Sequence, residues 1–120
     1  MMIKICTDLV QSTRLRDILP IDTADAYWEQ DYDKPKAVIG NYLLHNQCME
    51  DKDYKRLSKD VISPAWTAHA LINVLGCCTL DFSDNHYCRV YCKGKYSEWY
   101  DNEIDGCVEI IKRMHKEGKL

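Results

Sequence analysis

The stretch CCTLDFSDNHYCRVYCKGKYSEWY, residues 77–100, decides the fold class of this 120-residue chain. Three of its segments are rich in Tyr, Val, Cys and Thr, residue types that favour strands: residues 77–82, 86–92 and 95–100. The pairs Asp84-Asn85 and Lys93-Gly94 separate these segments, and both pairs are typical of tight turns. The sequence therefore predicts a three-stranded antiparallel meander over residues 77–100.

The two turns also predict which residues lie opposite one another in the meander. A three-residue loop at 83–85, with Asn85 in the left-handed conformation, places Leu80 opposite Cys88. A two-residue turn at Lys93-Gly94 places Cys88 opposite Trp99. One sheet face then collects the residues expected in the core: Cys78, Leu80, Phe82, Cys88, Val90, Cys92 and Trp99.

The opposite face of the predicted sheet is dominated by tyrosines. We name it the tyrosine face, and its members are Tyr87, Arg89, Tyr91, Tyr96, Glu98 and Tyr100. In the predicted register Arg89 pairs across the strands with Glu98, with a tyrosine pair on either side. Tyrosine combines apolar area with a polar tip and few rotatable bonds, so this face is the predicted binding site.

Three further segments have the apolar spacing of helices: residues 8–19, 64–75 and 103–117. Thr7-Asp8 and Asn102 are expected to cap the first and the third of these helices. Ser63-Pro64 is expected to begin the second, because proline suits the first helical position. With the meander, these helices predict an α+β fold.

The stretch between the first two helices is less determined by its pattern. Residues 24–28 and 38–43 each favour a strand, and the spacing of Tyr54, Leu57 and Val61 indicates a short helix. Six acidic residues and no basic residue lie between Asp17 and Asp33. We interpret this run as a solvated surface, with a mimic of DNA as the alternative.

Length and composition point to one soluble domain over residues 1–120. Apolar residues make up 46% of the chain, and the net charge is −3, so a folded domain with little general attraction for nucleic acid or anionic lipid is expected. The longest apolar stretch, residues 74–78, is far shorter than the roughly 20 residues of a membrane span. Residues 1–8 lack the apolar segment of a secretory signal, so a cytoplasmic location is expected.

The seven cysteines suggest a metal site at first sight, because Cys88 and Cys92 lie near His86 and Cys78. On one strand, however, Cys88 and Cys92 would be separated by roughly 13 Å. No metal and no cofactor are therefore predicted, and the odd count indicates reduced thiols. A nucleophilic cysteine beside one of the four histidines stays a minor alternative, with no catalytic residue assigned.

Several short motifs are familiar together: Thr7-Asp8, Gln11-Ser12, Ile18-Leu19-Pro20, Thr23-Ala24-Asp25, Pro64-Ala65-Trp66-Thr67, Trp99-Tyr100-Asp101 and Cys107-Val108-Glu109. They resemble a family of small proteins without an assigned activity, encoded by gut bacteria, their phages and integrated mobile elements. The likeness covers residues 7–28 and 63–117, and it departs from the family pattern at His69 and Gly76. It implies a bacterial or phage accessory protein.

These observations predict a small cytoplasmic accessory protein that acts by binding another protein through the tyrosine face. One alternative is a module that binds a small ligand or a nucleotide on that face, because tyrosine and arginine side chains stack on planar groups. A homodimer that covers the face is also left open, and an enzyme that depends on a cysteine is the minor alternative.

Overall fold

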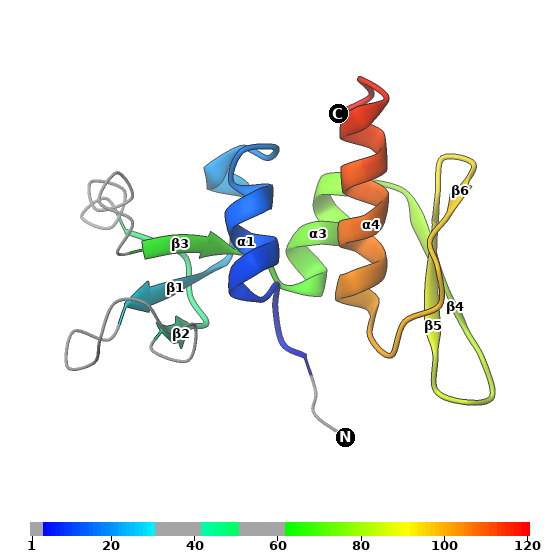
Figure 1. The fold of residues 1–120 in the computed structure, drawn as a ribbon, viewed down its shortest axis with the longest axis horizontal. Helices are drawn as coiled ribbons and strands as arrows, with labels where there is room; N and C mark the ends of the chain where they lie inside the picture. The colour runs from blue at the N-terminus through cyan, green and yellow to red at the C-terminus, as the bar shows by residue number, and fades with distance from the viewer. Residues whose placement is uncertain (1–3, 31–41, 51–61) are drawn as a thin grey trace. The chain divides into compact units, whose positions relative to one another are not determined.

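The structure is a computed structural model, and it describes residues 4–30, 42–50 and 62–120 (Figure 1). This described part contains three α-helices and two three-stranded antiparallel sheets, which confirms the predicted α+β class. The chain divides into two compact units. Unit 1 consists of Met1–Cys6 and Thr67–Leu120, and unit 2 consists of Thr7–Trp66. That the whole chain is one domain stays a prediction.

Unit 1 contains the predicted meander and the predicted C-terminal helix. Its helices are α3 (Ala68–Leu75) and α4 (Glu103–Lys116). Its strands are β4 (Cys78–Phe82), β5 (Cys88–Cys92) and β6 (Lys95–Tyr96), in the order β4-β5-β6. Helix α4 packs against both α3 and β5 (Figure 1). As predicted, Asn102 caps α4, since its side chain accepts a hydrogen bond from the N–H of Asp105 at 2.8 Å.

The first hairpin loop has the predicted length but begins one residue later than predicted. The Ser83 N–H donates to the Tyr87 carbonyl at 2.9 Å, and His86, rather than Asn85, takes the left-handed conformation with φ +64°. The Ser83 hydroxyl also accepts from the Tyr87 N–H at 3.2 Å, which stabilises this placement. Leu80 therefore lies opposite Val90 and not opposite Cys88. Because the shift is two residues, every side chain keeps its predicted face.

The second hairpin follows the prediction at its turn and departs from it further on. Tyr91 lies opposite Tyr96 as predicted, but Cys88 pairs with Tyr100 instead of Trp99. The cause is Ser97, whose hydroxyl accepts the Val90 N–H at 2.8 Å in place of a main-chain carbonyl. One extra residue is accommodated after Ser97, as in a β-bulge. Because of the bulge, Trp99 and Tyr100 lie on the sheet faces opposite to those predicted for them. The predicted core position of Trp99 is therefore wrong.

The core of unit 1 lies between β5 and α4. Val90 and Cys92 are fully buried and Cys88 nearly so, as predicted, whereas the Phe82 side chain is 71% exposed and does not belong to the core. A Cβ atom at Gly106 would lie only 2.8 Å from Val90 Cγ2, so glycine allows α4 to approach β5 closely. Phe82 lies at the end of edge strand β4, where nothing in the described part of the sheet flanks it on its outer side.

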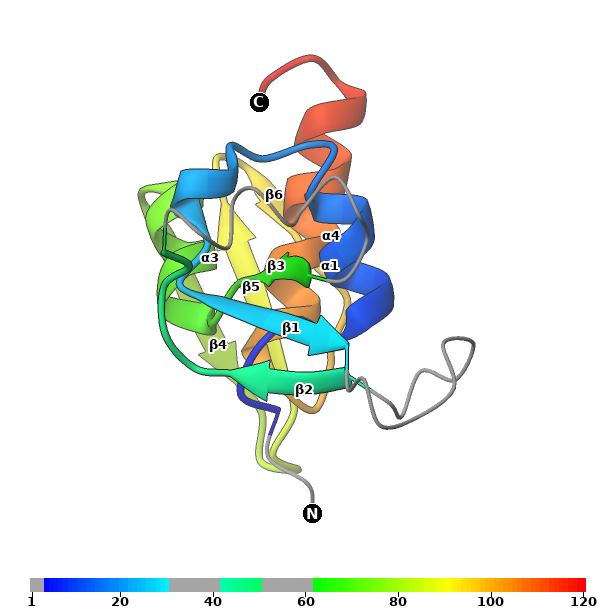
Figure 2. The ribbon, with the colours of Figure 1, turned by 90° about the vertical axis from the view of Figure 1, so that its left-hand side faces the viewer.

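Unit 2 is a helix beside a second small sheet (Figure 2). Its elements are α1 (Leu9–Leu15), the short 3₁₀ helix η1 (Ile21–Thr23), β1 (Ala26–Gln30), β2 (Tyr42–His45) and β3 (Ile62–Ala65). The strand order is β2-β1-β3, with both pairings antiparallel. Asp8 and Gln11 form a reciprocal capping box at the start of α1, which confirms Asp8 as the predicted cap.

The predicted start of the second helix at Ser63-Pro64 is wrong. Both residues belong to β3, where Pro64 lies opposite Tyr27 of β1. An edge strand tolerates proline because the missing N–H can face away from the neighbouring strand. Helix α3 begins after Thr67 instead, whose hydroxyl accepts the Ala70 N–H at 3.3 Å, and Gly76 ends it as predicted with φ +81°.

The predictions for the middle of the chain are tested only in part. The strand predicted at residues 24–28 corresponds to β1, and the end of the one predicted at 38–43 overlaps β2. Residues 38–41 and the short helix predicted around Tyr54, Leu57 and Val61 lie outside the described residues.

The two ends of unit 2 meet in a buried hydrogen-bond network centred on Thr7. The Thr7 N–H donates to the Trp66 carbonyl at 2.9 Å, and the Trp66 N–H donates to the Thr7 hydroxyl oxygen at 3.1 Å. The Thr7 hydroxyl also shares a hydrogen bond of 2.7 Å with Ser12, and its carbonyl accepts the Trp28 indole N–H at 3.0 Å. Unit 2 therefore begins and ends at two hydrogen-bonded residues.

Candidate functional site

Arg89 on β5 contacts two exposed aromatic rings. Its guanidinium carbon is 4.2 Å from the ring centroid of Tyr96 and 4.7 Å from that of Trp99. Tyr96 is 49% exposed and Trp99 is 43% exposed. Cation–π contacts at such distances are attractive and hold the guanidinium in place. We call Asp81, Arg89, Tyr91, Tyr96 and Trp99 the Arg89 cluster.

The strand pairing explains the rest of the cluster. Asp81 lies directly opposite Arg89, and its Oδ2 accepts hydrogen bonds from Nε and Nη2 of Arg89, both at 3.3 Å. Tyr91 lies opposite Tyr96, with ring centroids 4.6 Å apart and an interplanar angle of 44°. The bulge after Ser97 adds Trp99 to the same face. Arg89 is thus held by two aromatic rings and, through its Nε and Nη2, by the Asp81 carboxylate.

The structure brings together three residues of the predicted tyrosine face: Arg89, Tyr91 and Tyr96. A fourth, Tyr87, is 47% exposed and lies two residues before Arg89, where the chain leaves the hairpin loop. The predicted cross-strand pair of Arg89 with Glu98 is wrong, because the bulge after Ser97 takes Glu98 out of the ladder, and its main-chain N–H bonds to Glu109 instead. On the other side of β5 the shifted loop places Asp81 opposite Arg89, where Thr79 was predicted. The part of these residues in binding stays a prediction.

Tyr100 does not lie on the tyrosine face, in contrast to the prediction. It pairs with Cys88, on the side of the sheet that packs against α4, and its hydroxyl donates to Glu109 Oε1 at 2.9 Å. Burial, followed by this hydrogen bond, raises the pKa of Tyr100 to about 12. The Glu98 main-chain N–H donates to the same carboxylate at 3.2 Å. Tyr100 and Glu109 therefore anchor the strand end to the helix.

Sequence reasoning missed Trp99 as a member of the cluster. Its face depends on whether the residues after Tyr96 continue a regular ladder, and regular alternation places Trp99 in the core. The deciding contact is the hydrogen bond between the Ser97 hydroxyl and the Val90 main chain. A serine in a strand is too common to indicate a bulge, so no reliable signal was present.

Four cysteines of unit 1 lack a property that catalytic nucleophiles need. Burial raises the pKa of Cys78, Cys88 and Cys92, and raises that of Cys107 to about 12. A reactive thiol needs a lowered pKa, because the thiolate is the nucleophile. Among the residues that the structure describes, no group of three or more His, Cys, Asp or Glu could hold a metal ion.

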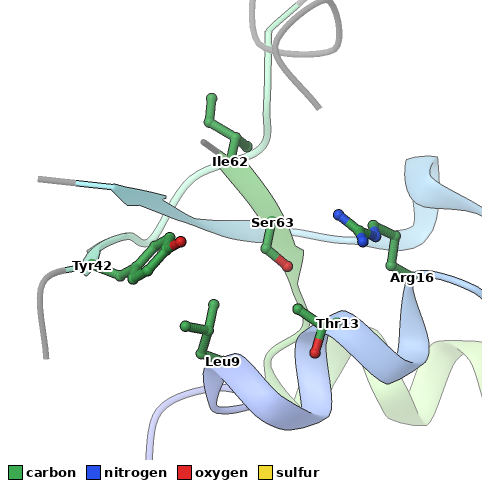
Figure 3. A pocket seen from close by; sticks show the side chains of 6 residues that line it. All are labelled: Leu9, Thr13, Arg16, Tyr42, Ile62 and Ser63. Atoms are coloured by element: carbon green, nitrogen blue, oxygen red, sulfur yellow. The ribbon is translucent and has the colours of Figure 1, made fainter. Parts of the chain in front are cut away.

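Unit 2 contains a pocket of about 310 Å³, near the lower size limit of ligand pockets (Figure 3). It is lined by Leu9, Thr13, Arg16, Tyr42, Ile62 and Ser63. Figure 3 shows Tyr42 and Arg16 extending toward Ser63 from opposite sides.

Comparison of the chain with protein-family models, with curated proteins and with solved structures finds no match. Among the described residues, no helix is both long enough and apolar enough to cross a membrane.

Proposed function

We propose that the protein acts by binding another protein through the Arg89 cluster. The observation that carries the proposal is the pair of half-exposed rings, Tyr96 and Trp99, that both contact the Arg89 guanidinium. Tryptophan, tyrosine and arginine are the side chains that dominate binding energy at protein interfaces. Because contacts within the sheet already order these side chains, binding costs them little conformational entropy.

The same geometry favours a protein partner over a nucleotide. The Arg89 guanidinium already contacts the rings of Tyr96 and Trp99, so a base that stacked on it would compete with these contacts. Asp81 accepts two of the Arg89 N–H groups, and its negative charge repels phosphate. A nucleotide site on the tyrosine face is therefore the weaker alternative.

For the cellular setting we propose a bacterial or phage accessory protein in the cytoplasm. Support comes from the resemblance of residues 7–28 and 63–117 to the gut-bacterial and phage family. The odd number of cysteines agrees with a reducing compartment.

Affinity capture with matched variants tests the proposal. We expect the wild-type protein and Val10→Ala to retain the same bacterial protein from a lysate, and Trp99→Ala to lose it. Val10 is a suitable control because it is an exposed apolar residue on α1, outside unit 1. With the captured protein purified, calorimetry should show a dissociation constant at least about 30-fold higher for Trp99→Ala, as for an interface hot spot. Equal capture by all three proteins would contradict the proposal.

A thermal-shift panel tests the nucleotide alternative. We expect no nucleotide to raise the melting temperature of the wild-type protein. A shift that is present in the wild type and absent in Trp99→Ala would instead assign the Arg89 cluster to nucleotide binding.

A further inference from the structure

We propose that β4 pairs edge to edge with β4 of a second copy of this chain, forming a two-fold symmetric dimer with a continuous six-stranded sheet. The inference does not rest on the proposed function, because it is argued from the open edge of β4, although Asp81 of β4 also belongs to the Arg89 cluster. Within the described residues β4 has one strand neighbour, β5, so its outer edge offers unpaired main-chain groups.

The hydrogen-bond pattern shows which main-chain groups face outward. Ser83 pairs with Tyr87 through a bond of 2.9 Å, and hydrogen-bonded pairs alternate along an antiparallel ladder. The main-chain groups of Thr79 and Asp81 therefore point toward β5. Those of Cys78, Leu80 and Phe82 point to the open edge, where a second strand could receive up to about six hydrogen bonds.

The sequence of β4 is complementary to itself when two copies run antiparallel about Leu80. In this register Leu80 lies opposite Leu80 of the second copy, and Phe82 lies opposite Cys78, so one face of the joint is entirely apolar. On the other face Thr79 lies opposite Asp81, whose carboxylate can accept a hydrogen bond from the hydroxyl. The two Asp81 carboxylates do not face each other, so no like-charge pair opposes the joint.

Phe82 gives a reason for the second copy to be present. It is 71% exposed, the most exposed of the large apolar side chains described. Strands that must remain unpaired usually carry proline, lysine or a bulge at the edge. β4 has none of these, and its one charge, Asp81, is paired with Arg89. A second β4 strand would cover Phe82 and satisfy the open main-chain groups at once.

A joint of five residues from each copy is small for a protein interface. We therefore expect a reversible dimer with a dissociation constant on the order of 1–100 μM. Sedimentation velocity from about 5 to 500 μM should show the monomer convert to a dimer as the concentration rises.

Two variants of β4 and one control identify the surface. Phe82→Lys puts a charge on the exposed apolar end, and Leu80→Pro removes an N–H that the monomer does not use, so each should raise the dissociation constant at least tenfold. Val10→Lys makes the same kind of change on α1, and Trp99→Ala changes the Arg89 cluster; both should dimerise like the wild type. A monomeric wild type, or β4 variants that dimerise normally, would overturn the proposal.

Amide hydrogen exchange tests the register without relying on any variant. In the dimer the N–H groups of Cys78, Leu80 and Phe82 should exchange more slowly at high than at low concentration. Those of Thr79 and Asp81 should be protected at both concentrations, because they are bonded to β5 in the monomer. Dimerisation without this alternating pattern would place the contact elsewhere and overturn the proposal.

Discussion

The Tyr100 hydroxyl donates a hydrogen bond to the Glu109 carboxylate, and this contact helps to link the end of the meander to α4. Its raised pKa, about 12, has a defined effect on stability. Below the pKa of an unfolded tyrosine, near 10, the hydrogen-bonded phenol makes its full contribution to the free energy of unfolding. This contribution disappears as the pH rises toward about 12. We expect the free energy of unfolding to fall over this range. Tyr100→Phe should cost about 1–2 kcal/mol at pH 7.

Urea denaturation of the wild type and Tyr100→Phe from pH 7 to pH 12 checks this prediction. The difference in unfolding free energy between the two proteins should shrink above pH 10. Using the difference removes the common effect of Cys107, whose raised pKa weakens both proteins in the alkaline range. A difference that stays constant with pH would show that the hydroxyl contributes nothing through its ionisation.

The thiols should differ strongly in reactivity at neutral pH. Cys48 and Cys77 are exposed, whereas Cys107 is fully buried with a pKa of about 12. We therefore expect iodoacetamide at pH 7.5 to modify Cys48 and Cys77 within minutes and to leave Cys107 intact until the protein unfolds. Peptide mass spectrometry measures each site separately. Early modification of Cys107 in the folded protein would contradict the buried position described here.

At the scale of elements, the contact between α4 and β5 depends on one glycine. Glycine is usually unfavourable inside a helix, and alanine would improve helix propensity by about 1 kcal/mol. At position 106, however, the added methyl would lie 2.8 Å from Val90 Cγ2. We expect Gly106→Ala to lower the unfolding free energy by about 1–3 kcal/mol, because overpacking outweighs propensity.

A double-mutant cycle with Val90→Ala provides the control for the glycine prediction. Val90→Ala removes the methyl group that the new side chain would strike, so Gly106→Ala should be much less harmful in that background. The Ser97 hydroxyl lies 3.1 Å from the same position and leaves some crowding. Equal effects of Gly106→Ala in both backgrounds would show that the close approach is not the cause.

The elements that could be predicted from the sequence have local signals. The Asn102 cap and the apolar stripe define α4, and Lys93-Gly94 fits the second turn because Lys93 and Gly94 both take positive φ. The elements that could not be predicted depend on side chains replacing main-chain bonds or on contacts distant in sequence. The Ser83 hydroxyl stabilises a first loop that begins one residue later than predicted, and the Ser97 hydroxyl stabilises the bulge. Pro64 lies in a strand because β1 pairs with it.

The candidate site shows the same limit. Arg89, Tyr91 and Tyr96 could be placed together from the sequence. Alternation along β5 puts Arg89 and Tyr91 on one face, and the Lys93-Gly94 turn puts Tyr96 opposite Tyr91. Trp99 and Tyr100 lie on the opposite faces from those predicted because the bulge inserts one extra residue before them. Strand propensity does not indicate such a bulge. Arg89 lost its predicted partner Glu98 through the bulge, and it gained Asp81 in place of Thr79 through the shifted first loop.

At the scale of the whole molecule, the single-domain prediction can be tested with the three tryptophans. Trp28 and Trp66 belong to unit 2 and Trp99 to unit 1. In Trp99→Phe the tryptophan fluorescence therefore reports only residues 7–66, whereas far-UV circular dichroism is dominated by α3 and α4 of unit 1. For one cooperative domain the two thermal transitions should have the same midpoint. Midpoints several degrees apart would mean that the units unfold separately.

The discontinuity of unit 1 has a consequence for the order of synthesis. Lys4 bonds to Asp105 at 2.7 Å, and Cys6 forms a bridge with Thr67, so Lys4 and Cys6 depend on partners that are synthesised much later. Unit 2 has all its residues, including the Thr7–Trp66 pair, once residue 66 has been added. Residues 67–120 then require roughly 3–10 s at about 5–20 residues per second. Lys4 and Cys6 are therefore synthesised before residues 7–66 but reach their final bonds after them.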